Sequence, residues 1–112
     1  MAVPKRIFTF DEARRLLPVV RERTRKALDA LSEVEVGPDE EPGQARERLE
    51  KAAGAILEEW AREMEGMGIL VKGPWLVDFD SGGGYFCWKW PEESLDFYHG
   101  YDEGFSGRVR IQ

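Results

Sequence analysis

The stretch WLVDFDSGGGYFCWKW (residues 75–90) decides the fold, because apolar and polar side chains alternate on both sides of a glycine run. Alternation with a period of two is typical of a half-buried β-strand. Pairing the two halves across the glycine run sets Val77 opposite Trp88 and Asp78 opposite Cys87. The sequence therefore predicts a β-hairpin with one apolar face and one polar face.

Similar alternation continues to the C-terminus and predicts a sheet of four short strands. These are Trp75–Asp80, Tyr85–Trp90, Leu95–His99 and Phe105–Ile111. We expect Trp90 to pair with Leu95 in an antiparallel meander. We also expect His99 to point to the apolar face and to pair with Phe105. The turn between these two residues is expected to hold Gly104 at positive φ. The polar face then carries Asp78, Asp80, Tyr85, Cys87, Lys89, Asp96, Tyr98, Ser106, Arg108 and Arg110.

The first two thirds of the chain are typical of amphipathic helices. Thr9 and Glu12 form a capping box, and the apolar residues that follow are three or four apart. Pro18 predicts a kink rather than a stop. Residues 33–43 carry the turn-forming Gly-Pro and Pro-Gly pairs and predict a loop, after which a second apolar stripe runs to Gly66.

These elements define the expected fold class. We predict an α+β fold in which an antiparallel helical hairpin (residues 9–68) packs on one face of a four-stranded antiparallel β-meander (residues 75–111). A chain of 112 residues is expected to form a single domain, residues 1–112. Two helices cannot cover both this aromatic sheet and each other, so we expect a homodimer.

Composition excludes some classes of partner. The net charge of −6 disfavours nucleic acid, and the chain has no apolar run long enough to span a membrane. One cysteine cannot form an internal disulfide, which indicates a reducing, cytoplasmic location. Eleven arginines against five lysines, with no asparagine, are typical of a heat-adapted, thermophile protein.

Four segments carry a resemblance to a known family. They are Phe10–Pro18 (FDEARRLLP), Leu76–Phe79 (LVDF), Cys87–Lys89 (CWK) and Tyr98–Arg108 (YHGYDEGFSGR). They resemble the domain-of-unknown-function 2203 family of short bacterial proteins. The resemblance spans nearly the whole chain and implies a bacterial, cytoplasmic origin, but it implies no activity. Trp90-Pro91-Glu92 departs from the family pattern, which weakens any role for Glu92 or Glu93.

The polar face of the predicted sheet is the leading candidate for a binding site. Its expected ligand-binding residues are Asp78, Lys89, Tyr98, His99 and Arg108. Arginine can grip a carboxylate or phosphate with two hydrogen bonds, and tyrosine adds a flat wall. The alternative is a solvated face on which cross-strand ion pairs contribute little. Arg108 would then pair with Asp78 or Asp102.

Cys87, His99 and Asp78 are residue types that ligate zinc, but the chain has no Cys-x-x-Cys or His-x-x-x-His spacing. His99 is also expected on the opposite face from the other two. The same separation disfavours a Cys87 nucleophile with His99 as its base. We therefore assign no metal and no cofactor from the sequence.

The leading interpretation of function is a non-catalytic binding or interaction module for a small anionic ligand or a protein partner. The first alternative is a small enzyme that acts on an anionic metabolite, with Lys89 and Arg108 holding the anion and Asp78 or His99 moving protons. The second alternative is a metal-binding protein that uses Cys87, His99 and Asp78.

Overall fold

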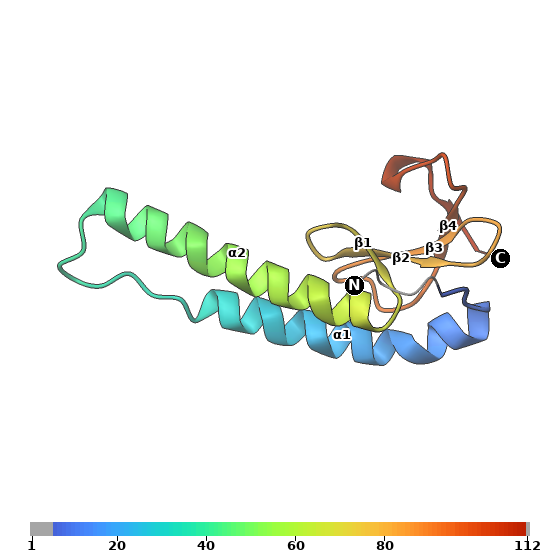
Figure 1. The fold of residues 1–112 in the computed structure, drawn as a ribbon, viewed down its shortest axis with the longest axis horizontal. Coiled ribbons are helices and arrows are strands. Elements are labelled where there is room, and N and C mark those ends of the chain that lie inside the picture. The colour runs from blue at the N-terminus through green and yellow to red at the C-terminus, as the bar shows by residue number, and fades with distance from the viewer. Residues whose placement is uncertain (1–5, 112) are drawn as a thin grey trace.

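The structure is a computed structural model that describes residues 6–111. Two long helices form an antiparallel pair, and a small sheet lies against one end of the pair (Figure 1). The elements are α1 (Phe10–Ser32), α2 (Pro42–Gly66), β1 (Leu70–Gly73), β2 (Leu76–Asp80), β3 (Tyr85–Lys89), β4 (Phe97–His99), the 3₁₀ turn η1 (Phe105–Gly107) and β5 (Val109–Arg110). The predicted α+β class is confirmed.

Helix α1 begins at the predicted capping box. The Thr9 hydroxyl accepts the Glu12 amide at 3.1 Å, and the Glu12 carboxylate accepts the Thr9 amide at 2.9 Å. This exchange satisfies two of the amides that an isolated helix leaves unpaired. Pro18 lies inside α1, and the helix continues past it to Ser32.

The sheet has five antiparallel strands in the order β1-β2-β3-β4-β5, where the sequence predicted four. The strand that the prediction missed is β1, which follows α2 directly and pairs with β2. The predicted last strand is wrong over Phe105–Gly107, because these residues form η1 and only Val109–Arg110 pair with β4. Gly104 has φ −105°, so the predicted left-handed turn is also wrong.

The predicted register is confirmed for the first hairpin and wrong for the next. Asp78 pairs with Cys87 and Val77 with Trp88, as expected. Cys87 then pairs with Phe97, one residue away from the predicted partner Tyr98. Because side chains alternate along a strand, this shift by one residue turns every side chain of β4 to the opposite face. The predicted pairing of His99 with Phe105 is wrong as well, since His99 pairs with Tyr85.

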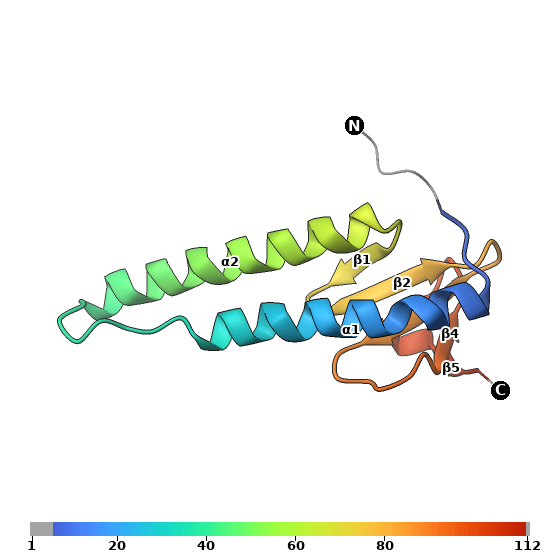
Figure 2. The ribbon, with the colours of Figure 1, turned by 90° about the horizontal axis from the view of Figure 1, so that it is seen from below.

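The helices cover one face of the sheet and leave the other to the C-terminal segment. Val77, Phe79 and Trp88 are fully buried in the core that the sheet shares with Trp60 and Met64 of α2. Figure 2 shows α1 crossing in front of the strands, and Figure 1 shows the segment around η1 on the far side of the sheet. We call that second side, which carries Asp78, Cys87 and His99, the open face of the sheet.

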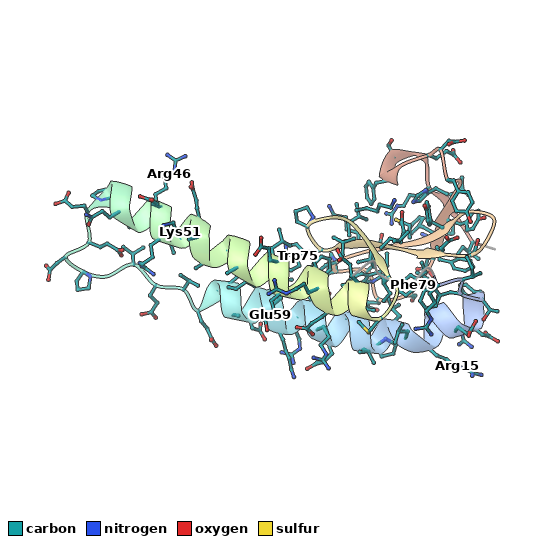
Figure 3. The ribbon with its side chains drawn as sticks, viewed as in Figure 1. Arg15, Arg46, Lys51, Glu59, Trp75 and Phe79 are labelled. Carbon is teal, nitrogen blue, oxygen red and sulfur yellow. The ribbon has the colours of Figure 1, made fainter. Side chains whose placement is uncertain are left out.

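The helical hairpin extends well beyond the sheet. The molecule is 53 Å long, and Figure 3 shows Arg46 and Lys51 on the part of α2 that has no strand beside it, whereas Trp75 and Phe79 lie at the sheet end. Across residues 6–111, neither helix is both long and apolar enough to span a bilayer. The chemistry-bearing residues are therefore gathered at one end of the molecule.

Candidate functional site

Three ionisable side chains meet on the open face of the sheet. Asp78 of β2, Cys87 of β3 and His99 of β4 are all buried, and one ligating atom from each lies within 4.8 Å of the others. Sequence reasoning placed His99 on the apolar face and therefore kept these groups apart. The observed register of β4 corrects that error, because pairing His99 with Tyr85 points the imidazole to the same side as Asp78 and Cys87.

The hydrogen bond of His99 fixes its tautomer. Nδ1 lies 2.9 Å from the carbonyl oxygen of Gly100, and because a carbonyl can only accept, Nδ1 carries the proton. In a neutral imidazole the other nitrogen, Nε2, then presents a lone pair. Nε2 lies 3.0 Å from Oδ2 of Asp78, so a neutral imidazole would set two electron-rich atoms against each other inside the protein.

Asp78 is the most unusual group of the site. Its side chain is 1% exposed, and its polar neighbours Nε2 of His99 and the Cys87 thiol do not meet the geometry of a good hydrogen bond to either carboxylate oxygen. Burying an ionised carboxylate without compensation is costly, and such groups are normally paired, hydrogen-bonded or bound to a metal. A proton on Nε2 or a cation among the three side chains would relieve the repulsion.

Two opposing influences act on the pKa of the Cys87 thiol. Burial first, then the charge of the Asp78 carboxylate and a hydrogen bond to it, raise the pKa of the thiol to about 12. Arg108 acts in the other direction, since its Nη1 donates to Sγ at 3.9 Å and favours the thiolate. In the absence of another cation, the thiol therefore stays protonated at neutral pH.

This geometry opposes the covalent-catalysis reading of the sequence. A histidine that activates a cysteine must contact the sulfur with one ring nitrogen and an orienting partner with the other. Here Nδ1 of His99 is bound to Gly100 O, and Nε2 faces Asp78. Neither nitrogen is left for Cys87, and the raised pKa of its thiol makes it a poor nucleophile.

Arg108 has a defined position beside the site. Glu92 accepts two hydrogen bonds from the guanidinium, which also stacks 3.9 Å from the ring centroid of Phe97 and 4.1 Å from that of Phe105. The partners expected from the sequence, Asp78 or Asp102, are thus replaced by Glu92. Glu92 has a structural role despite the departure of its segment from the family pattern.

A pocket of about 320 Å³ lies over the three buried groups. Its lining comprises Lys72, Leu76, Asp78, Tyr85, Cys87, His99, Tyr101, Glu103, Gly104 and Phe105. Lys72, Tyr101 and Phe105 are exposed, so the pocket opens to solvent. Residues of β1, β2, β3 and β4 and of the C-terminal segment therefore surround the three buried groups at the floor of the pocket.

The sequence-predicted site residues divide into two groups. Asp78 and His99 form the pocket floor. Arg108 donates to the sulfur of Cys87 but does not itself line the pocket. Tyr98 lies on the helix-facing side, where its ring packs 5.6 Å from that of Phe86, so it is not part of the pocket. The Lys89 ammonium lies 5.3 Å from the centre of the Phe105 ring and does not line the pocket either.

Sequence reasoning missed three polar residues of the pocket. Lys72 lies on the unpredicted strand β1, with its ammonium 4.7 Å from the centre of the Tyr85 ring. The Tyr101 hydroxyl donates to Asp80 at 2.6 Å, and Glu103 accepts the Gly100 amide at 3.0 Å. The apolar pair Leu70-Val71 before Lys72 was the available signal for β1, but a strand of four residues is too short to show a clear period of two.

Fold and site together define an α+β protein in which a helical hairpin supports a sheet with a Cys-His-Asp cluster on its open face. Residues 6–111 match the DUF2203 family, described as "uncharacterized conserved protein". The match covers nearly the whole chain, and the chain belongs to this family, as the resemblance indicated. Comparison with curated proteins and with solved structures finds no match for the chain.

Proposed function

We propose that this protein binds a transition-metal ion of the zinc class through Asp78, Cys87 and His99. The observation that carries the proposal is the buried Asp78 carboxylate, whose oxygens have no well-formed hydrogen bond and which lies with Nε2 of His99 and Sγ of Cys87 in one cluster of ligand atoms within 4.8 Å of one another. A cation between these groups turns a repulsive contact into two bonds. The bond from Nδ1 of His99 to Gly100 O is the usual outer contact of a zinc-ligating histidine.

The donor set favours zinc over the hard cations. Thiolate and imidazole are ligands of zinc and its neighbours in the first transition row, whereas calcium and magnesium require mostly oxygen. Tetrahedral ligation at about 2.0–2.3 Å separates the ligand atoms by roughly 3.3–3.5 Å. Nε2 of His99 and Oδ2 of Asp78 are 3.0 Å apart and all three ligand atoms lie within 4.8 Å of one another, so closure around an ion requires the more distant atoms to approach.

An anion bound directly on the open face has weaker support. The buried Asp78 carboxylate repels an anion at the pocket floor. The guanidinium of Arg108, the expected anion-binding group, already donates two hydrogen bonds to the Glu92 carboxylate. A metal ion removes the first objection, because it neutralises the carboxylate.

The test is metal binding by untagged protein purified without chelator. We expect about one equivalent of zinc by elemental analysis, or uptake of one equivalent by the metal-free protein in competition with a chromophoric chelator. The chain has one cysteine and one histidine, so a cobalt(II)–thiolate absorption band could come from Cys87 alone. That band reports on the wild-type protein even if ligand variants fold poorly.

Matched variants locate the ion. Cys87→Ser, His99→Gln and Asp78→Asn should each weaken zinc binding by about 100-fold or more, since even residues that only contact a ligand typically contribute 10–100-fold. Asp96→Asn is the control, because Asp96 precedes β4, is neither a proposed ligand nor a pocket-lining residue, and is paired only loosely with Arg110 at 3.9 Å. Wild-type protein that takes up less than about a tenth of an equivalent would overturn the proposal. The cluster would then be a metal-free pair of Asp78 and imidazolium.

A further inference from the structure

All three proposed ligands rise from one side of one sheet. Asp78, Cys87 and His99 come from the adjacent strands β2, β3 and β4, and the paired residues Asp78 and Cys87 lie side by side. An ion held by them sits above the strands. A tetrahedral ion with three ligands below it has its fourth position directed away from the sheet. That direction is the pocket, because the same three residues form its floor.

We infer that this fourth position is exchangeable and that it takes the carboxylate of a small organic monoanion. The inference rests on the proposed metal site and names the class of ligand for it. Within the described residues, no fourth metal-ligating side chain joins the cluster, so solvent or a small molecule completes the coordination. Three protein ligands with one open position are the arrangement that zinc sites use for exchangeable ligands.

The pocket walls suit a short apolar body on such an anion. Leu76, Tyr85, Tyr101 and Phe105 contribute aliphatic and aromatic surface. A volume of about 320 Å³ is at the lower end for small-molecule sites, so the pocket fits a molecule with a single ring or a short chain. Stacking of an aromatic ring on Tyr101 or Phe105 adds to the contact.

The charges around the pocket set the charge of the ligand. A divalent ion balances one carboxylate and one thiolate, which leaves the floor neutral. Lys72 then supplies one positive charge at the wall, beside the ring of Tyr85. Glu103 supplies one negative charge in the same lining. An anion with one carboxylate can bind the metal and approach Lys72, whereas a second carboxylate meets the repulsion of Glu103.

The experiment uses the cobalt(II)-loaded, full-length protein and follows its visible spectrum. Phenylacetate should change the cobalt bands and saturate at one equivalent per metal. Phenylacetamide has the same shape without the charge and should bind at least about tenfold more weakly, the expected loss for one charge-assisted contact. 4-Carboxyphenylacetate, whose second carboxylate is too far from the first to chelate the same ion, should also bind more weakly than phenylacetate.

Three variants separate the contributions to binding. Lys72→Met should weaken phenylacetate binding about tenfold, whereas Glu103→Gln should tighten it roughly threefold by removing a like charge across a solvated pocket. Lys51→Met is the matched control, because Lys51 is exposed on the part of α2 that has no strand beside it and does not line the pocket. It should leave phenylacetate affinity and the cobalt spectrum unchanged.

The two proposals fail in different ways. Absence of the cobalt–thiolate band means that the metal site is wrong, and the ligand inference fails with it. A cobalt–thiolate band whose spectrum does not respond to millimolar phenylacetate or acetate leaves the metal site intact and overturns the inference alone. Equal binding of phenylacetate and phenylacetamide overturns the monoanion assignment in the same way.

Discussion

Glu92 grips Arg108 with two parallel hydrogen bonds of 2.8 and 3.0 Å, although the two residues are sixteen positions apart. The pair is mostly shielded from water, with 12% of the Arg108 side chain and 23% of the Glu92 side chain exposed. A forked contact of this kind fixes the plane of the guanidinium as well as its position. Glu92 thereby aims Nη1 of Arg108 at the sulfur of Cys87.

Weakening the Glu92–Arg108 contact should lower the affinity for zinc without removing a metal ligand. Arg108 favours the thiolate form of Cys87, which is the form that binds metal. Arg108→Lys loses the paired hydrogen bonds to Glu92 and the stacking on the aromatic rings. Glu92→Gln loses the negative charge that holds the guanidinium in place. We expect each to lower zinc affinity roughly tenfold, the lower end for residues that support a ligand. Chelator competition measures the change.

Arg110→Gln is the control for that series. Arg110 is 69% exposed and lies 3.9 Å from Asp96, so its charge is solvated even though its guanidinium shares the Phe97 ring with Arg108. Its substitution should leave zinc affinity within twofold, about the resolution of such a comparison. If Arg110→Gln weakened binding as much as Arg108→Lys, the effect would be one of general charge and not of the Glu92–Arg108 contact.

A buried hydrogen bond between the helices offers a test of the core. The indole N–H of Trp60 donates to the hydroxyl of Thr24 at 2.9 Å, and that hydroxyl donates to the Val20 carbonyl at 2.7 Å. Thr24→Val keeps the shape but leaves the buried indole N–H without an acceptor. We expect a loss of about 1–3 kcal/mol in the free energy of unfolding, measured by urea titration.

Thr24→Ser separates the hydroxyl from the methyl group. Serine keeps the hydrogen bond to Trp60 and loses one buried methyl, which costs about 1 kcal/mol. Thr24→Val should therefore be the more destabilised of the two. The opposite order would mean that packing of the methyl group, and not the bond to the indole, holds the helices together here.

Local pattern was sufficient to predict the helices and the central hairpin. The capping box at Thr9 fixes where α1 begins, and strict alternation fixes the β2–β3 register, because only one register buries Val77 against Trp88. Strand β1 was missed because its turn into β2 contains Trp75 at φ 60°, a conformation that turn rules assign to glycine or asparagine. The Trp75 ring is held 5.0 Å from that of Trp60, a contact between segments far apart in sequence.

The site depends on which face of the sheet the side chains of β4 occupy, and the local sequence does not encode that choice. The predicted four-residue link after Trp90 put His99 with the core, whereas β3 already ends at Lys89 and β4 begins only at Phe97. The link is longer because Leu95 turns into the core and the Trp88 indole donates to the Glu92 carbonyl at 2.7 Å. These tertiary contacts shift the pairing by one residue and bring His99 to Asp78.

The homodimer expected from the sequence stays a prediction. Val19 of α1 is 41% exposed, and the distal half of the hairpin has no strand beside it, so apolar surface is left for a second copy. Size-exclusion chromatography with light scattering should give twice the mass of one 12.8 kDa chain at micromolar concentration. A mass of one chain there would contradict the prediction.

Tyr101 should ionise well above the ordinary pKa of a tyrosine. Its hydroxyl donates to Asp80 at 2.6 Å, and this hydrogen bond, then burial and then the charge of Asp80, raise its pKa to about 12. The chain has three tyrosines, so subtracting the ultraviolet titration of Tyr101→Phe from that of the wild type isolates one phenol. We expect the isolated step to have its midpoint near pH 12, above the ordinary value of about 10.

The sign of the linked stability change follows from that shift in pKa. The folded protein holds the Tyr101 proton more tightly than the unfolded chain, so this contact stabilises the fold fully below about pH 10. The contribution is lost as the pH rises through the folded pKa of about 12. Replacing Asp80 with asparagine should move the Tyr101 midpoint back towards 10, because the charged acceptor is gone. An unchanged midpoint in Asp80→Asn would show that Asp80 does not cause the shift, and the rim of the pocket would then be held by other contacts.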